Sequence, residues 1–345
     1  MKKFDRLMSI AGLLMILSIP NSSTANDGDF DADNDFPAVG RIAAVTTVFG
    51  EVRFAGAYCS GSLIAEDVFL TAGHCQFFDT PRLAEVPGYA VEYWVSFDNA
   101  ASNNDFFCYL QDIDHPNKND VACNPGTTNG TTFHKALASV VHPEYAPIVD
   151  TNGTSKILDL LIFQESSDLS LLILETSIDD ITPLEVAPPR TFNRKSEFLG
   201  QPLTAVGYGV NFHKSIPATP DQPGGNGPTN FEGSASFRRI ADIGTLQGVS
   251  KLWMTPTQNN ARGEDSICFG DSGSPLFFGR FGGEVDQTVS GVLSWGASPW
   301  CKGAHDFYSR VDTPQAASFI SCVMTASSVT EVCECGIEDK FGLCD

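Results

Sequence analysis

The two stretches that decide the fold are Thr71-Ala72-Gly73-His74-Cys75 and Gly270-Asp271-Ser272-Gly273-Ser274-Pro275. A neutral serine hydroxyl is a weak nucleophile, and it needs a histidine to accept its proton and a buried carboxylate to orient that histidine. His74 and Ser272 suit the first two roles. The glycines allow a tight turn that exposes the hydroxyl and directs the N–H groups of Gly270 and Ser272 at one point. Two such donors can hold the oxyanion of a tetrahedral intermediate.

Several further segments extend this pattern along the chain. They are His142-Pro143-Glu144-Tyr145, Val206-Gly207-Tyr208-Gly209, Ser294-Trp295-Gly296 and Tyr308-Ser309-Arg310-Val311. With these segments in this order, from about residue 36 to residue 320, the sequence resembles the chymotrypsin-like (trypsin-family) serine peptidases. Gly73 replaces the alanine and Ser274 the glycine usual in that family. The resemblance implies a mainly β fold of two antiparallel barrels, with the catalytic residues in the cleft between them.

The carboxylate of the triad has two candidates in the sequence. The family places its aspartate before a short apolar strand, and Asp168 precedes Leu169-Ser170-Leu171-Leu172. Asp159 is followed by a similar apolar run, but Asp168 comes directly after a polar segment, as a residue at the mouth of a strand should. We therefore assign Asp168. An insertion near residues 99–132 accounts for its long separation from His74.

The resemblance also indicates which residues bind the substrate. The floor of the specificity pocket is Ser266, and Ser294-Trp295-Gly296 forms a wall that pairs with an extended substrate backbone. A serine on the floor favours apolar or aromatic side chains. Asp306, however, stands where the family usually has glycine, and a carboxylate there attracts Arg or Lys. Alternatively Asp306 turns to solvent or bonds to His305. We expect a basic or mixed preference at P1.

Ten cysteines in an exported protein are candidates for disulfides. The resemblance implies Cys59–Cys75 beside the histidine and Cys268–Cys301 at the specificity pocket. Within the insertion we infer Cys108–Cys123. The remaining cysteines form two more pairs in an unassigned order: Cys322, Cys333, Cys335 and Cys344. No histidine lies near these four, so a metal site is a weak interpretation of them, and we expect neither a metal nor a cofactor.

The N-terminal residues predict export. Lys2, Lys3 and Arg6 precede an apolar run and then the small residues Ser23-Thr24-Ala25, which is the pattern of a secretory signal peptide over 1–25. We expect a secreted protein with no membrane anchor, extracellular or periplasmic, and the short basic start is typical of bacteria. The net charge of -21 repels phosphate backbones and argues against nucleic acid as a partner.

The chain divides into five expected segments. They are the signal peptide (1–25), an acidic arm (26–35), the first barrel (36–185), the second barrel with a C-terminal helix (186–325) and a Cys-rich tail (326–345). The arm is interpreted as solvated, because its aspartates lack the glycine and glutamate spacing of a calcium loop. Polar stretches 99–132 and 211–230 are expected to be irregular surface loops. Alternating residues predict strands near 91–97, 204–208 and 288–294.

One helix is predicted near the C-terminus. Thr313 can cap it and Pro314 suits its first turn. Five apolar residues share one face: Ala316, Phe319, Ile320, Val323 and Met324. The tail beyond residue 325 lies outside the resemblance and is interpreted either as a disulfide-stapled cap or as a binding appendage.

Activation is the point where the sequence departs from the family. Family zymogens are cut to expose an amino group that pairs with the aspartate before the nucleophile, here Asp271. Arg41-Ile42 offers a site for such a cut, but 36–42 fits the first strand of the fold better. Two other functions are alternatives to the peptidase: an inactive protease-like binding or adhesion protein, and an α/β-hydrolase esterase. The expected partners are protein or peptide substrates and proteinaceous inhibitors, on a monomer.

Overall fold

The computed structural model describes residues 28–79, 86–116, 130–145, 166–210, 236–259, 262–296, 301 and 305–336. Several residues and segments singled out in the sequence lie outside these ranges. They are the expected signal peptide, the loop expected at 211–230, Asp159, Cys123 and Cys344.

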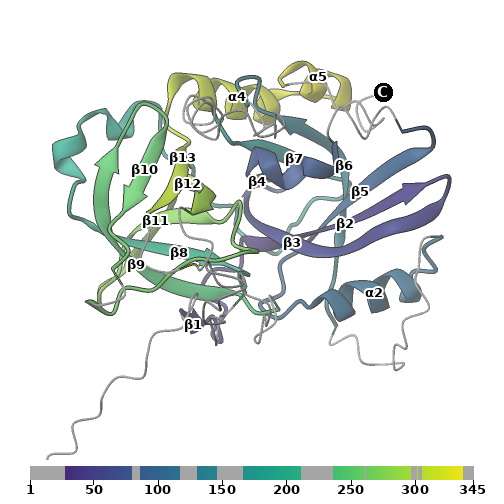
Figure 1. Ribbon diagram of the computed structural model, residues 1–345. Coiled ribbons are helices and arrows are strands. Elements are labelled where there is room, and N and C mark those ends of the chain that lie inside the picture. Colours follow the sequence, from purple (N-terminus) through teal and green to yellow (C-terminus); the bar gives the residue numbers. More distant parts are fainter. Residues whose placement is uncertain are drawn as a thin grey trace, which may run out of the picture.

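Six antiparallel strands close the first barrel in the order β2-β3-β4-β7-β6-β5 (Figure 1). The strands are β2 (Val39–Val48), β3 (Glu51–Ala65), β4 (Val68–Thr71), β5 (Tyr89–Ser96), β6 (His134–Val141) and β7 (Ser170–Leu174). Leu63, Phe69 and Leu171 are fully buried inside it. Interior side chains of a small barrel fill its centre, so the barrel is a packed core.

The second barrel has the strand order β9-β10-β13-β12-β11-β8, and pairing of β8 with β9 closes the ring. The strands are β8 (Pro202–Gly207), β9 (Arg239–Val249), β10 (Trp253–Pro256), β11 (Pro275–Gly279), β12 (Val285–Gly296) and β13 (Asp306–Arg310). Two short 3₁₀ turns lie in the connection between the barrels, η2 (Thr191–Asn193) and η3 (Lys195–Glu197). The expected mainly β fold with two antiparallel barrels is confirmed.

The insertion in the first barrel is only partly a loop. Its residues 103–112 form the helix α2 (Asn103–Asp112), which Ser102 caps by accepting a hydrogen bond from the N–H of Asp105. Phe106 and Leu110 pack with Trp94 in a second apolar cluster on the outside of the barrel. The expectation of an irregular surface stretch is therefore wrong here, and α2 explains why both faces of β5 are largely buried.

The acidic arm is attached to the second barrel. β1 (Asp29–Phe30) pairs with β9. Asp31, only 1% exposed, accepts a 2.7 Å hydrogen bond from Nε of the fully buried Arg238. Arg238 also donates to the carbonyl oxygens of Val39 and Phe97, both at 3.0 Å. The interpretation of the arm as solvated is wrong for Asp31, because the sequence does not reveal a buried guanidinium more than 200 residues away.

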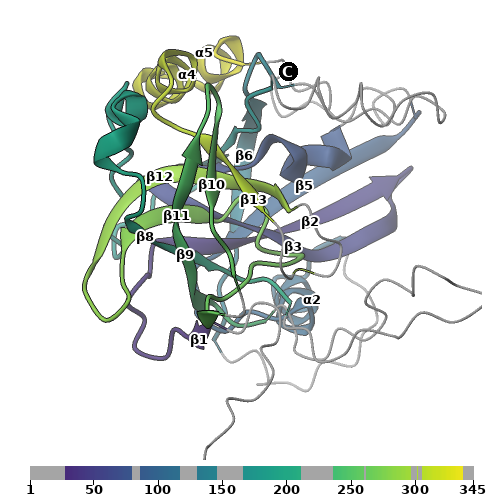
Figure 2. The ribbon, with the colours of Figure 1, turned by 60° about the vertical axis from the view of Figure 1, so that its left-hand side comes forward.

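The predicted C-terminal helix is α4 (Pro314–Thr325), with Thr313 as its N-cap. Four of the five predicted apolar residues are buried, but Met324 is 47% exposed and does not belong to that face. α5 (Val329–Glu334) follows, and the Cys322–Cys335 disulfide ties its end to α4. Both views place α4 and α5 together at the opposite end of the molecule from α2 (Figures 1 and 2). None of the helices formed by the described residues is long and apolar enough to cross a membrane.

Candidate active site

His74 lies at the point where β4 leaves the first barrel. β4 pairs with β3 on one side and β7 on the other, and η1 (Gly73–Asp79) begins two residues after its end. The Cys59–Cys75 disulfide joins this turn to β3. The Ser170 hydroxyl donates a 2.9 Å hydrogen bond to the carbonyl of Ala72. Three strands and a disulfide therefore hold the backbone that carries the histidine.

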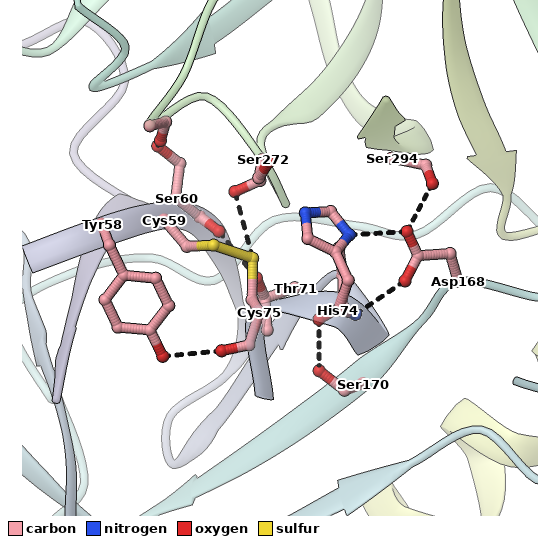
Figure 3. Close-up of a disulfide and its surroundings, with 12 residues drawn as sticks. Tyr58, Cys59, Ser60, Thr71, His74, Cys75, Asp168, Ser170, Ser272 and Ser294 are labelled. Carbon is pink, nitrogen blue, oxygen red and sulfur yellow. Dashed lines mark hydrogen bonds and ion pairs between the residues drawn. A yellow bond between two sulfur atoms is a disulfide. The ribbon is translucent and has the colours of Figure 1, made fainter. Parts of the chain in front are cut away.

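Asp168 meets His74 in two hydrogen bonds. Nδ1 of His74 lies 2.7 Å from Oδ2 of Asp168, and the His74 backbone N–H donates to Oδ1 at 2.8 Å (Figure 3). In the same view the other ring nitrogen is on the side of the ring toward Ser272. A carboxylate that binds both the ring and the backbone of one histidine fixes its tautomer and its orientation. Asp159, the other candidate, lies outside the described residues.

Two serines of the second barrel complete the surroundings of Asp168. The Ser294 hydroxyl donates to Oδ2, and the Asp168 N–H donates to Oγ of Ser309 at 3.1 Å. Ser294 was predicted as part of the substrate wall and Ser309 was not singled out, although it lies in the Tyr308-Ser309-Arg310-Val311 segment. Both barrels therefore hold the carboxylate, which is completely buried.

His74 and Asp168 each stabilise the charged form of the other. Burial opposes the charged form of each, but the carboxylate and its hydrogen bond raise the pKa of His74 above its ordinary 6.5. Conversely, burial raises the pKa of Asp168, and the charge of His74 with the hydrogen bonds from His74 and Ser294 lowers it further than burial raises it. The result is an ionised Asp168 beside a histidine that accepts a proton readily.

Ser272 is anchored to the first barrel beside the histidine turn. Its carbonyl accepts a 2.7 Å hydrogen bond from the Ser60 N–H and lies 3.5 Å from Sγ of Cys75. Gly273 follows with φ +85°, and a Cβ there would collide with Oγ1 of Thr71 and the carbonyl of Ser60. Glycine is therefore required here both for its conformation and for the close approach of the two chains.

The turn before Ser272 leaves two backbone donors unused. Among the described residues, neither the N–H of Gly270 nor that of Ser272 donates a hydrogen bond. Gly270 has φ +101°, which glycine adopts without strain. Asp271 holds the turn by accepting from the N–H groups of Gly209 (2.7 Å) and Cys268 (2.8 Å). Burial raises the pKa of Asp271 to about 7 despite these hydrogen bonds.

Three of the predicted pocket residues, Trp295, Gly296 and Asp306, lie together at the edge of β12 and β13. Gly296 pairs with Asp306, and a Cβ on Gly296 would lie 2.6 Å from Oδ1 of Asp306. Ser266 is fully buried and Trp295 is half-buried, stacked 4.2 Å from the Phe307 ring. The Cys268–Cys301 disulfide that the resemblance implies is present.

Asp306 does not turn to solvent. It is 4% exposed, and Gln258, which sequence reasoning missed, provides a side-chain hydrogen bond. Oδ2 of Asp306 has no hydrogen-bond partner among the described residues. Burial raises the pKa of Asp306 well above its ordinary value. The Gln258 hydrogen bond lowers it, and the negative charge of Asp271 raises it again.

Two further expectations concern cysteines and activation. Cys59, His74 and Cys75 lie close enough together to resemble a metal-binding group, but the two sulfurs are bonded to each other and are not available as thiolate ligands. Cys108 and Cys333 are also disulfide-bonded. Arg41 and Ile42 are buried within β2, where burial lowers the pKa of Arg41 to about 10. The fold therefore agrees with 36–42 leading into the first strand.

Residues 127–320 match the family model described as Trypsin, and the chain belongs to the trypsin family of serine proteases. Human heparin binding protein is similar in structure, with 16% identity, a TM-score of 0.50, and 87% of this chain and 97% of that one covered. A mutant of that protein gives a TM-score of 0.51 at 16% identity, with 88% and 97% covered. Neuropsin, a serine protease of mouse brain, has 18% identity, a TM-score of 0.47, and coverage of 86% and 99%. No curated protein matches the chain.

Proposed function

We propose that the chain is an exported serine endopeptidase in which Ser272, His74 and Asp168 form the catalytic triad. Family membership and fold support a peptidase in general, and the paired hydrogen bonds between His74 and Asp168 carry the assignment of this chain as an active one. A scaffold kept only for binding has no need of an ionised, fully buried carboxylate aligned on the histidine. The α/β-hydrolase alternative is wrong, because the fold is two β-barrels.

We infer the following mechanism for these groups. Ser272 Oγ attacks the carbonyl carbon of the scissile peptide while His74 Nε2 takes the hydroxyl proton. Asp168 stabilises the imidazolium that forms. The N–H groups of Gly270 and Ser272 donate to the oxyanion, and His74 then returns its proton to the leaving amine. Water attacks the acyl-enzyme by the same route in reverse, which releases the second product.

We further propose that the pocket has a basic or mixed preference for the substrate residue at P1. Asp306 would determine this preference, and Ser266 would form the neutral floor of the pocket. The support is a buried carboxyl with one oxygen lacking a partner, since a buried charge gains most from a partner of opposite sign. Trp295 and Gly296 form the wall for the extended substrate. Protein or peptide substrates are the proposed partners of a monomer, and the proposed division of the chain remains 26–35, 36–185, 186–325 and 326–345.

Export is part of the proposal. The signal-peptide pattern of residues 1–25 supports secretion, and disulfides at Cys59–Cys75, Cys268–Cys301 and Cys322–Cys335 suit an oxidising compartment. The N-terminus of the protein recovered from culture medium, read by sequencing, is expected at residue 26. A start within 28–42 would instead indicate proteolytic activation.

The deciding experiment uses the purified protein and peptide amides with Arg, Lys, Phe, Leu or Ala before the scissile bond. A Ser272→Ala variant serves as the control, because it removes the nucleophile and little else. Cleavage that disappears in the variant establishes the serine peptidase. Equal rates in both proteins, or no cleavage by a protein with a sequenced and homogeneous N-terminus, would favour the inactive binding protein.

A further inference from the structure

A cavity of about 530 Å³ lies away from the active site, where α4 and α5 meet the segment after β6. Figures 1 and 2 both show α4 and α5 side by side next to the end of β6. The lining residues come from all three elements: His142, Pro143, Glu144, Pro314, Gln315, Ser318, Phe319, Cys322, Glu334 and Cys335. The match to the family model ends at residue 320. One wall of this tail cavity is therefore built by residues beyond the match, namely Cys322, Glu334 and Cys335.

The lining of the tail cavity combines apolar surface with negative charge. Pro143, Phe319 and the Cys322–Cys335 disulfide provide the apolar part. Glu144 and Glu334, both exposed, line it from different elements, and the described lining residues include no Lys or Arg. The side chains of Lys and Arg suit such a surface, because each has an aliphatic stem and a cationic end.

His142 adds a buried polar group to the lining of the cavity. It is 1% exposed, and its Nδ1 accepts a 3.0 Å hydrogen bond from the Glu144 N–H, so the proton of the neutral ring is on Nε2. Among the described residues Nε2 makes no hydrogen bond of normal geometry, although the backbone of Gln315 is close enough to favour the charged ring. A buried donor of this kind gains from an acceptor such as a peptide carbonyl.

We propose that the tail cavity binds a lysine- or arginine-containing segment of a polypeptide, separately from the active site. Glu144 and Glu334 attract the cation, the apolar surface covers the stem, and His142 donates to a backbone carbonyl of the segment. Because the whole chain carries a net charge of -21, association with a basic segment is also favoured at long range. The proposal stands independently of peptidase activity.

The position of the cavity connects it to the active site through one short segment. The Tyr145 N–H donates a 2.9 Å hydrogen bond to the carbonyl of His142, and the Tyr145 ring reaches within 3.0 Å of the place where a Cβ on Gly73 would lie. A polypeptide held in the tail cavity therefore touches the segment that packs on the histidine turn. The proposed occupant therefore lies close to the turn that carries His74, whether or not the active site cleaves it.

The test measures binding of a fluorescein-labelled peptide of alternating Lys and Ala by fluorescence anisotropy. The background protein carries Ser272→Ala and Asp306→Asn, so that it neither cleaves the peptide nor attracts it to the pocket through that carboxylate. In this background Glu144→Gln/Glu334→Gln is expected to raise Kd about tenfold. Ser318→Trp, which fills the cavity without changing charge, is expected to raise Kd at least as much.

The matched control is Glu175→Gln/Glu284→Gln, which removes the same charge from two exposed glutamates elsewhere. Its effect on Kd should stay below about twofold, the part due to net charge alone. Thermal midpoints verify that all variants are folded. Equal weakening by the two glutamine pairs, retention of affinity in Ser318→Trp, or no saturable binding by the background protein would each overturn the proposal.

Discussion

Asp168 and Asp306 are both buried carboxyls, yet their surroundings differ in kind. Asp168 accepts hydrogen bonds from the backbone and ring of His74 and from the Ser294 hydroxyl, and its pKa is lowered. Asp306 has one hydrogen bond from Gln258 and one oxygen without a partner, and its pKa is raised. Burial raises the pKa of both, so the hydrogen-bond partners and the neighbouring charge make the difference.

Asp168 therefore has its hydrogen-bond partners in the free protein, whereas Asp306 has one oxygen that a bound ligand would pair. Asp168 is already ionised and fixed, as electrostatic preorganisation requires. Burial raises the pKa of Asp306, and under the proposed P1 preference a cationic side chain would supply the partner that its second oxygen lacks. Four experiments test this difference between Asp168 and Asp306. They replace one of the two carboxyls, change its protonation or crowd it.

Asp168→Asn should have the largest effect. The amide cannot stabilise an imidazolium and favours the wrong tautomer of His74, so kcat for a peptide amide should fall about 10⁴-fold with little change in KM. The measurement is steady-state kinetics on the best substrate of the panel. Ser294→Ala, which removes a single donor to the same carboxylate, should cost much less. A loss in Asp168→Asn no greater than that in Ser294→Ala would contradict the assignment of Asp168.

Asp306→Asn should change specificity more than catalysis. The substitution preserves size and removes the charge, so kcat/KM for Arg and Lys substrates should fall about 100-fold, while that for a Leu substrate should stay within about twofold. Ser266→Ala is the control at the pocket floor and should affect both substrates alike. If Asp306→Asn leaves the ratio of kcat/KM for Arg and Leu substrates unchanged, Asp306 does not determine the P1 preference.

The pH dependence provides a subtler test of the same contrast. The catalytic base must be neutral, so kcat/KM for every substrate should fall as pH drops through the raised pKa of His74. Asp306 must lose its proton to bind a cation, and its pKa is also raised. The ratio of Arg to Leu cleavage should therefore rise, about tenfold, from acid to neutral pH. In Asp306→Asn the ratio should be flat, and a flat ratio in the unmodified protein would refute the role of this carboxyl.

Short motifs predicted the parts of the molecule in which residue type determines the chemistry. His74, Asp168 and Ser272 could be proposed as base, carboxylate and nucleophile because such groups have recognisable neighbours in the sequence, among them Gly273 with its positive φ. Helix α4 was predicted because Thr313 and Pro314 mark its start locally. These features depend on residues near each other in the chain.

Features that depend on distant partners were not predictable. Nothing beside Asp31 in the sequence indicates Arg238, and nothing beside Asp306 indicates Gln258. Helix α2 was missed because its polar composition resembles a loop, and its apolar residues Phe106 and Leu110 become significant only against Trp94 on a neighbouring strand. Tertiary contacts decide these cases, and local propensity does not.

Substitution of Gly73 should have the smallest effect on kcat. It tests how tightly the surrounding residues hold Asp168 in position. A Cβ at this position would lie 3.0 Å from the Tyr145 ring and 3.1 Å from Oδ1 of Asp168, so its neighbours must move by a few tenths of an ångström. We expect Gly73→Ala, which introduces the usual residue of the family, to lower kcat about threefold, because small misplacements in a fixed site reduce the rate.

The matching variant is Gly73→Ala/Tyr145→Leu, in which the smaller side chain makes room for the added methyl group. If crowding by the Tyr145 ring displaces Asp168, the double variant should recover most of the lost kcat, whereas Tyr145→Leu alone should not increase kcat. Kinetics and thermal midpoints of all three variants separate this coupling from a general loss of stability. Unchanged kcat in Gly73→Ala would mean that the neighbours of Gly73 move without displacing Asp168, and that its hydrogen bonds to His74, Ser294 and Ser309 are enough to position it.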